Sequence, residues 1–277
     1  MAGTNNLAEG SESSKNRYTR ILEDIFERKF KPGKFEVVFT RDEIVDTAKR
    51  LGIDLPKNLG DLPYTFRYRS DIPDSIRKKA PAGKSWVIWP AGRGKYRLAP
   101  AKNFEFIPRD DVAETKLPDA TPGIIEKYAQ GDEQALLAKM RYNRLIDVFT
   151  GITSYSLQSH LRTTVEELGQ VETDEVYVGI DKRGVQYVFP VQAKNRDDVI
   201  GVVQIKQDIA MCREKFPLLH CRPIGAKFLA DGQIAMLEFE SDGDEIKVLS
   251  EKHYRLVPPD KVTKEDLAKY SLRPTDS

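Results

Sequence analysis

Residues 169–195, GQVETDEVYVGIDKRGVQYVFPVQAKN, constrain the fold more than any other stretch because they predict a single β-hairpin. Apolar residues alternate with polar ones from 175 to 181, and β-branched and aromatic residues dominate from 185 to 194. The intervening KRG at 182–184 fits a three-residue hairpin loop in which glycine takes the left-handed position. The sequence therefore predicts two antiparallel strands joined by a tight turn.

The length of this loop sets the pairing of the two strands. If Asp181 lies opposite Val185, then Asp174 lies opposite Gln192, and directly opposed Cβ atoms are about 5 Å apart. Pro190 cannot donate to the ladder, so it predicts a bulge or an unpaired edge that would shift this register by one residue.

Polar residues at the end of the hairpin have a chemical use. Lys194 emerges on the same face as Gln192, so a carboxylate, an amide oxygen and an ammonium converge. Asp174 and the oxygen of Gln192 can hold Mg²⁺ at ~2.1 Å with waters and a substrate phosphate, and Mn²⁺ can substitute. Lys194 can orient or deprotonate the attacking water. The chemistry predicted is phosphodiester hydrolysis, and the alternative is a hairpin whose polar end simply enters solvent.

These residues resemble the motif of the PD-(D/E)XK nuclease superfamily, which has the restriction-endonuclease-like fold. In that motif an aspartate opens one strand and (D/E)-X-K follows on the next; here TD stands at 173–174 and QAK at 192–194. The resemblance covers residues 133–257. It implies a mixed α/β sheet flanked by helices, a divalent metal, and catalytic roles for Asp174, Gln192 and Lys194.

The chain departs from this motif at two positions. Thr173 stands where the motif has proline, and Gln192 stands where it has an acid, although some family members carry glutamine there. A neutral amide binds Mg²⁺ less strongly than a carboxylate does. Glu172 can compensate, since it forms a Glu-x-Asp variant known in the superfamily and shares a face with Asp174. A helix-borne acid is the other possibility.

Two helices are predicted ahead of the hairpin, over 133–149 and 156–168, because apolar residues recur there at helical spacing. Helices leading into a central hairpin are also what the resemblance implies. Glu166 and Glu167 fall in the last turn of the second helix, and Glu167, nearer the apolar stripe, is the candidate to complete the metal site.

After the hairpin, Asp197 and Asp198 are expected to cap a helix over 199–216. In several nucleases of this superfamily the helix after the lysine presents a glutamine to the active site or to DNA, and the resemblance gives that role to Gln204. Three further strands and a final helix complete the domain of residues 133–277. The strands are predicted over 221–229, 233–239 and 245–257, and the helix over 264–270.

Composition limits the alternatives. With 277 residues and 40% apolar content the chain can form two domains. Lys and Arg (44) nearly balance Asp and Glu (43), so net charge does not indicate a nucleic-acid partner.

The chain has only two cysteines, Cys212 and Cys221, and three histidines, and the cysteines do not have CxxC spacing. This argues against a zinc site and fits a cytoplasmic protein. The chain has no apolar run suited to a membrane, and residues 1–16 are predicted to be a disordered tail.

A small domain is predicted over residues 17–110, followed by a linker over 111–132. Its expected elements are a helix, a strand, two helices and a hairpin, at 16–30, 35–39, 41–51, 58–68, 85–89 and 95–99. The second helix begins with a capping box at Thr40 and Glu43. This order resembles a winged-helix domain in layout and not by any motif.

Basic residues concentrate in this domain: ten lie between positions 62 and 104, against two acidic ones. Such a distribution is typical of a nucleic-acid surface, and the glycine-rich hairpin tip at 90–94 allows close approach to a phosphate. The alternative is a solvated, charged surface. The residues expected to bind DNA are Arg67, Arg69, Lys84, Arg93, Lys95 and Arg97.

The sequence as a whole indicates a metal-dependent endonuclease acting on double-stranded DNA. A Type II restriction endonuclease is the most specific version, and symmetric double-strand cleavage would require a homodimer. A repair or junction-resolving nuclease is a second version of the same chemistry. A non-enzymatic winged-helix regulator is the alternative from another class, supported by the Gln192 departure.

Overall fold

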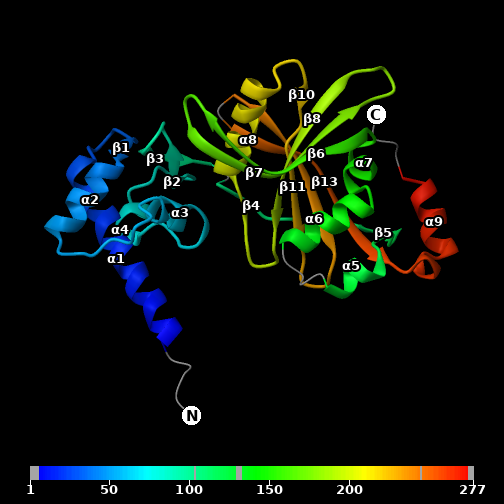
Figure 1. Ribbon diagram of the computed structural model, residues 1–277, viewed down its shortest axis with the longest axis horizontal. Coiled ribbons are helices and arrows are strands. Elements are labelled where there is room, and N and C mark those ends of the chain that lie inside the picture. Colours follow the sequence, from blue (N-terminus) through cyan, green and yellow to red (C-terminus); the bar gives the residue numbers. More distant parts are fainter. Residues whose placement is uncertain (1–5, 103, 129–132, 244, 274–277) are drawn as a thin grey trace, which may run out of the picture. The chain divides into compact units, whose positions relative to one another are not determined.

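The computed structural model describes residues 6–102, 104–128, 133–243 and 245–273. The chain forms two compact units, one of residues 1–104 and 164–171 and the other of residues 105–163 and 172–277. Figure 1 labels their elements, and each unit is described by itself. No helix within the described ranges is both long enough and apolar enough to cross a membrane.

The first unit packs helices against a small antiparallel sheet of order β1-β3-β2. Its elements are α1 (Asn6–Lys29), β1 (Val37–Thr40), α2 (Arg41–Arg50), α3 (Asp61–Tyr68), α4 (Asp74–Arg77), β2 (Ser85–Pro90) and β3 (Lys95–Ala101). Leu98 of β3 lies between Val37 and Ile88 in the ladder, and all three are buried in one apolar core. Ile25 and Phe26 of α1 pack into the same core.

Most elements of this unit agree with the sequence predictions. The capping box is confirmed. The hydroxyl of Thr40 accepts a hydrogen bond from the backbone amide of Glu43, and the carboxylate of Glu43 accepts one from the backbone amide of Thr40. The hairpin β2–β3 is also where it was predicted. Helix α1 begins at Asn6 and not near residue 16, although Gly10 and the serines at 11, 13 and 14 favour a helix only weakly; residues 1–5 of the predicted tail lie outside the described residues.

The second unit is built on a mixed sheet of order β5-β13-β12-β11-β8-β7-β6, in which β8 runs parallel to β11 and β13 parallel to β5. Its helices are α5 (Gly123–Tyr128), α6 (Glu133–Tyr142), α7 (Leu145–Thr150), α8 (Val202–Lys215) and α9 (Lys264–Ser271), with the 3-10 turn η1 (Pro259–Lys261). Its strands are β4 (Glu105–Phe106), β5 (Glu114–Pro118), β6 (Thr153–Val165), β7 (Gly169–Ile180), β8 (Gln186–Lys194), β9 (Ile200–Gly201), β10 (His220–Cys221), β11 (Ile224–Phe228), β12 (Ile234–Asp242) and β13 (Glu245–Val257). The end of β6 and the start of β7, within residues 164–171, belong to the first unit. The predicted mixed sheet flanked by helices is confirmed at this level.

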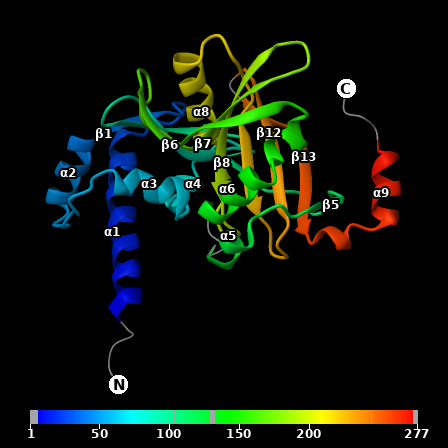
Figure 2. The same ribbon diagram turned by 45° about the vertical axis from the view of Figure 1, so that its right-hand side comes forward.

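Helices cover both faces of this sheet (Figures 1 and 2). On one face, Phe189 and Val191 of β8 pack in a core with Leu136 of α6 and Leu145 of α7. Side chains alternate along a strand, so the intervening residues of β8 face α8. The hairpin β7–β8 is therefore enclosed between the two helix layers.

The segment predicted as a helix over 156–168 is instead strand β6, and that prediction was wrong. The spacing of Leu157, Leu161 and Val165 imitates a helical stripe, yet the stretch is rich in threonine and serine and pairs with β7. Leu157 is 51% exposed, so the supposed stripe does not form a buried face.

The predicted linker over 111–132 also disagrees with the structure. Within it, β5 pairs in parallel with β13, and Leu117 faces Leu256 in that ladder. A strand of five residues with no strong alternation gives little signal in the sequence. Residues 129–132 lie outside the described residues.

Two helix boundaries differ from prediction. The helix expected over 133–149 breaks at Arg144, whose positive φ of 51° ends α6 and begins α7. Asp197 and Asp198 do not cap α8, which begins after the extended residue Gly201.

Candidate functional site

The register predicted for the hairpin is confirmed. Ile180 pairs with Gln186 and Glu175 pairs with Val191, in the alignment that sets Asp174 opposite Gln192. Pro190 faces Val176 without a register shift between the paired residues of β7 and β8, so the expected bulge does not form there.

Beyond the last backbone pair of β7 and β8, the side chain of Asp174 bonds to the backbone of β8. Its Oδ2 accepts a hydrogen bond from the backbone amide of Ala193 at 2.8 Å. Asp174 lies one residue and Ala193 two residues beyond the last pair of the ladder, Glu175 with Val191. This bond fixes the carboxylate at the point where β8 ends and Lys194 emerges.

Lys194 joins Asp174 to an acid from a distant part of the chain. Its Nζ lies 3.1 Å from Oε1 of Glu133, the first residue of α6, and 4.0 Å from Oδ2 of Asp174. Lys194 is only 9% exposed, so its charge is largely removed from water. Two carboxylates therefore share one buried ammonium.

Burial dominates the electrostatics of both acids. It raises the pKa of Asp174 above its ordinary value, against the opposing effects of Lys194 and the Ala193 amide. Burial likewise raises the pKa of Glu133, and the charge of Lys194 only partly offsets it. One ammonium is thus insufficient to compensate two partly desolvated carboxylates, and an additional cation would favour their ionised forms.

Glu175, the neighbour of Asp174, has a different role. It is fully buried on the α6 face, where its Oε1 accepts from Arg141 at 2.9 Å and from Ser156 at 2.5 Å. This ion pair ties α6 and β6 to β7, and we interpret it as structural.

Gln192, whose oxygen was predicted to bind a metal, lies in a buried hydrogen-bond network. It is 1% exposed, and its Nε2 donates to both carboxylate oxygens of Asp208, at 3.1 and 3.0 Å, and to the carbonyl of Glu172 at 3.4 Å. Its Oε1 accepts from Gln204 Nε2 at 3.0 Å. Both ends of the amide therefore have partners within the protein, and the ligand role of Gln192 stays a prediction.

The amide orientations in this network are mutually consistent. The carbonyl of Glu172 requires a donor from Gln192, which leaves Oε1 toward Gln204. Gln204 in turn accepts the amide of Gly201 with its own oxygen, at 3.5 Å. The helix after the lysine does present Gln204 to this region, as expected, and Gln204 contacts Gln192 there.

Asp208 is the polar residue on which this network converges. It is 1% exposed and also accepts the hydroxyl of Thr173 at 2.6 Å. Its burial raises its pKa to about 7, although the bonds from Thr173 and Gln192 favour the charged form. Thr173 stands where the motif has proline, and the hydroxyl it supplies is one that proline lacks.

The other candidate acids lie elsewhere. The carboxylate of Glu172 is exposed and pairs with Arg162 of β6 at 3.0 Å. Glu166 and Glu167 lie in the turn before β7, and the five residue-to-residue steps from Gly169 to Asp174 span about 17 Å of extended strand. Neither turn residue lies at the hairpin end, because the predicted helix that carried them is a strand. Glu133 is the second acid beside Lys194, and sequence reasoning missed it.

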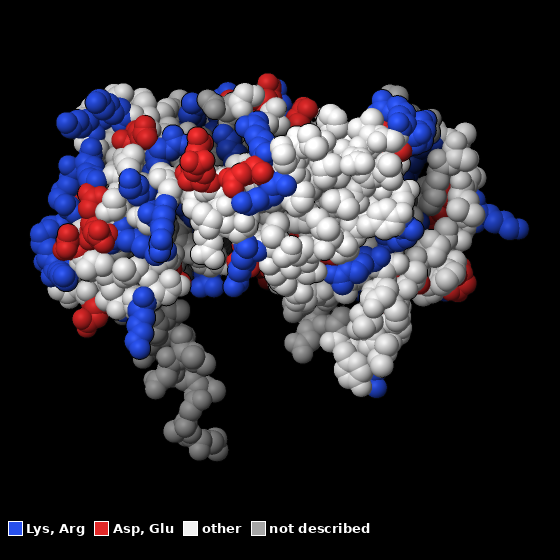
Figure 3. All heavy atoms as spheres, turned by 45° about the horizontal axis from the view of Figure 1, so that its top comes forward, with Lys and Arg blue, Asp and Glu red and all other residues white. Residues whose placement is uncertain are grey.

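The predicted DNA-binding residues divide into two groups. Arg67 is used internally: its Nε donates to the carbonyl of Ile88 at 2.6 Å and its guanidinium lies over the Tyr96 ring. Arg69 is exposed and lies over Tyr64 with its guanidinium carbon 4.8 Å from the ring centroid. The remaining residues of this set are exposed: Lys84, Arg93, Lys95 and Arg97. Figure 3 shows basic and acidic side chains interspersed on the face of the first unit in view, without a patch of a single sign.

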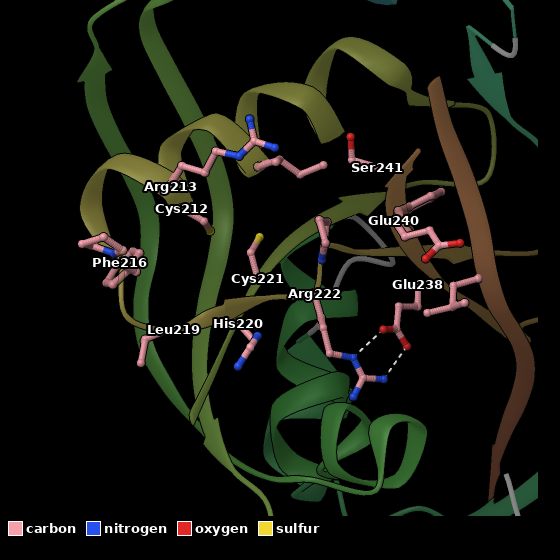
Figure 4. Close-up of a pocket in the computed structure, with 15 residues that line it drawn as sticks. Cys212, Arg213, Phe216, Leu219, His220, Cys221, Arg222, Glu238, Glu240 and Ser241 are labelled. Carbon is pink, nitrogen blue, oxygen red and sulfur yellow. Dashed lines mark hydrogen bonds and ion pairs between the residues drawn. The ribbon is translucent and has the colours of Figure 1, made fainter. Parts of the chain in front are cut away.

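A separate cavity of about 560 Å³ opens in the second unit, beside the C-terminal half of α8 (Figure 4). Cys212 and Cys221 meet in its wall, and their hydrogen bond, together with burial, raises the pKa of the Cys212 thiol. Two nitrogens of the Arg222 guanidinium bind the carboxylate of Glu238, so these two charges in the cavity wall are paired with each other. The lining lacks the acid–lysine arrangement of the hairpin end.

The donors at the hairpin end suit a hard divalent cation. Asp174 and Glu133 supply carboxylate oxygens, which Mg²⁺ prefers, and both carry raised pKa values that a cation would lower. Across the described ranges, no cluster of three or more acidic, histidine or cysteine side chains has the geometry of a complete metal site. Waters and a substrate oxygen would have to complete the coordination. Comparisons of the chain with protein-family models, with curated proteins and with solved structures found no match.

Proposed function

We propose that this protein is a metal-dependent endonuclease that hydrolyses phosphodiester bonds in double-stranded DNA. The observation that carries the proposal is the contact of Lys194 with Glu133 and its approach to Asp174, at the end of the confirmed hairpin. A buried lysine between two acids with raised pKa values is typical of a functional site rather than of a solvated strand end.

Each of these residues has a role in the proposed reaction. Asp174 and Glu133 would hold Mg²⁺ or Mn²⁺, which supplies Lewis-acid stabilisation of the phosphate charge when bound. Lys194, as an ammonium, would orient the attacking water and offset charge on the phosphate; to deprotonate that water it would first have to give up its own proton. Gln192, Gln204 and Asp208 would act as positioning residues that hold the end of β8 against α8.

The finer form of the proposal is a Type II restriction endonuclease acting as a homodimer. Its support is the resemblance of the residues at 173–174 and 192–194 to the PD-(D/E)XK motif, together with helices preceding the hairpin and a glutamine on the helix that follows it. The first unit, with a helix-rich core and an exposed basic hairpin, would be the winged-helix-like DNA reader. A repair or junction-resolving nuclease would use the same chemistry.

A DNA-binding regulator without enzymatic activity is the second candidate. The specific observation in its favour is that the amide of Gln192, at the position of the motif's acid, is fully engaged by Gln204 and Asp208. Under this candidate the hairpin end would be a remnant of a nuclease site.

The two candidates are separated by incubating the protein with genomic and plasmid DNA in millimolar Mg²⁺ or Mn²⁺, with EDTA as control, and sequencing the resulting ends. The nuclease proposal predicts metal-dependent ends, which cluster at one short sequence for a restriction enzyme. DNA that is bound but left intact with either metal would support the regulator.

A further inference from the structure

The only two cysteines of the chain, Cys212 and Cys221, lie side by side in the second unit. Cys212 belongs to α8 and Cys221 to β10, and both are free thiols. They share a hydrogen bond in the wall of the cavity of about 560 Å³ (Figure 4). Both thiols of the chain therefore meet, although different elements carry them.

The fold brings the two sulfur atoms together from opposite sides. Cys221 pairs with Val188 of β8 in a parallel ladder, so its side chain projects from the face of the sheet that α8 covers. Cys212 lies one turn after Asp208 on α8, and Asp208 reaches β8 through its bond with Gln192. Cys212 thus lies on the side of α8 that faces the sheet, and Figure 4 shows the Cys221 sulfur directed toward that helix.

The cavity gives a small molecule access to one of the two thiols. Cys212 is buried, whereas Cys221 is half-buried in the cavity wall. The hydrogen bond with Cys221, together with burial, raises the pKa of Cys212, so Cys212 stays a thiol at neutral pH. Cys221 is therefore the sulfur that an oxidant meets first.

A small uncharged oxidant suits this cavity. Apolar side chains such as Phe216 and Leu219 form part of the lining. An uncharged molecule is not excluded by the other ionisable groups that line it, which are Arg213, His220, Arg222, Glu238 and Glu240.

We propose that Cys212 and Cys221 form a redox modification site, at which a hydroperoxide converts the two thiols into a disulfide. With hydrogen peroxide, the Cys221 thiolate attacks one oxygen and the O–O bond breaks. Hydroxide leaves, takes up the proton that the Cys221 thiol lost, and becomes water, while Cys221 becomes a sulfenic acid.

The second step closes the bond. The sulfur of Cys212 attacks the sulfur of the Cys221 sulfenic acid, the S–O bond breaks, and the hydroxide leaves as water with the proton of the Cys212 thiol. The two sulfurs together lose two electrons, and one peroxide becomes two water molecules.

The disulfide would fasten the C-terminal end of α8 to β10 and close a loop of about ten residues. In reducing compartments such bonds are usually transient and redox-sensing rather than permanent. The modification does not depend on the proposed cleavage of DNA.

Thiol counting on the full-length protein tests the proposal. Reduced protein is freed of reductant, treated with hydrogen peroxide, unfolded with N-ethylmaleimide and analysed by mass spectrometry. The parent should take up no maleimide, and digestion without reductant should yield a peptide pair linked through Cys212 and Cys221. Treatment with dithiothreitol should restore two maleimide groups. The oxidised parent should also melt several degrees above the reduced parent, because the bond closes a loop.

The two single variants are matched controls, with dimedone added to trap sulfenic acid. Cys212→Ser should carry dimedone at Cys221, because no second thiol completes the bond, and peroxide should not raise its melting temperature. Cys221→Ser should take up no dimedone and should keep the buried Cys212 thiol, which reacts with maleimide after unfolding. Retention of both thiols by the peroxide-treated parent, or oxidation of both without a link between them, would overturn the inference.

Discussion

The ammonium of Lys194 lies 3.1 Å from a carboxylate oxygen of Glu133, although 61 residues separate them in the chain. This contact brings the first residue of α6 to the last residue of β8. In the proposed site Glu133, and not Gln192, is the second oxygen donor beside Asp174. The proposed site then has two carboxylates, although Gln192 stands where the motif that it resembles has an acid.

Asp174→Asn and Lys194→Met should each reduce cutting by at least ~100-fold, because one removes a metal ligand and the other the group that acts on water. Binding of duplex DNA in Ca²⁺ should remain close to that of the parent, since most phosphate contacts lie elsewhere. Cleavage and anisotropy assays on the same preparations measure both effects. Lys182→Met is the control for Lys194→Met, and retained cutting by either site variant would remove that residue from the mechanism.

Gln192→Glu should lower stability at pH 8, because it places a second carboxylate within about 3 Å of buried Asp208. The loss should shrink at pH 6, where one of the two carboxyls takes up a proton. Gln192→Leu, which has no hydrogen-bonding group, should cost about 1–3 kcal/mol at either pH by leaving polar neighbours unsatisfied. Urea unfolding at the two pH values provides the comparison. If Glu at position 192 is tolerated at pH 8 and lowers the metal requirement, Gln192 is a ligand after all.

Asp208 should make the unfolding free energy fall between about pH 4 and pH 7. Its pKa in the folded protein is about 7, whereas the unfolded chain loses this proton near the ordinary value of about 4. In that window the folded state binds one proton more than the unfolded state, so stability decreases as pH rises, by up to ~1.4 kcal/mol per unit. Above pH 7 the effect is constant. Asp208→Asn should remove this component, and an identical pH profile for parent and variant would contradict the assignment.

Arg67 should contribute to stability and not to DNA binding. Arg67→Ala removes the bond to the carbonyl of Ile88 and the contact with Tyr96, which should cost about 1–3 kcal/mol of unfolding free energy. Joint replacement of exposed Arg93 and Lys95 by alanine should instead leave the melting temperature unchanged and lower the salt slope of DNA binding by one to two units. Thermal melts and salt titrations distinguish the two. A lower salt slope for Arg67→Ala together with an unchanged slope for the double replacement would contradict this assignment of the DNA-binding side chains.

The hairpin could be predicted from the sequence because its determinants are local. A glycine loop and two alternating strands set the pairing of Asp174 with Gln192, and the structure keeps that pairing through Pro190. The contact with Glu133 could not be predicted in this way, since it depends on where α6 lies against the sheet. A helix-borne acid was expected to compensate for Gln192, but the local pattern favoured Glu167 and gave no sign of Glu133.

The main error in the fold has a definite cause. Leu157, Leu161 and Val165 recur every four residues, which favours a helix, whereas pairing with β7 makes the segment a strand. The pairing of this strand with β7 outweighs the local helical period. Glu166 and Glu167 therefore lie in the turn after β6 and not in a helix. Asp208 was visible as a polar residue on α8, but its burial follows from packing against β8.

Cleavage of supercoiled plasmid over a Mg²⁺ titration, by the parent and by Glu133→Gln, tests the central claim most directly. Glu126→Gln is the matched control, because it changes an exposed glutamate on α5, the helix before α6. The account predicts that the parent and the control cut at the same Mg²⁺ concentrations, while Glu133→Gln needs at least ten times more metal or does not cut. Equal metal requirements for all three proteins, or no cutting by the parent at any Mg²⁺ concentration, would contradict it.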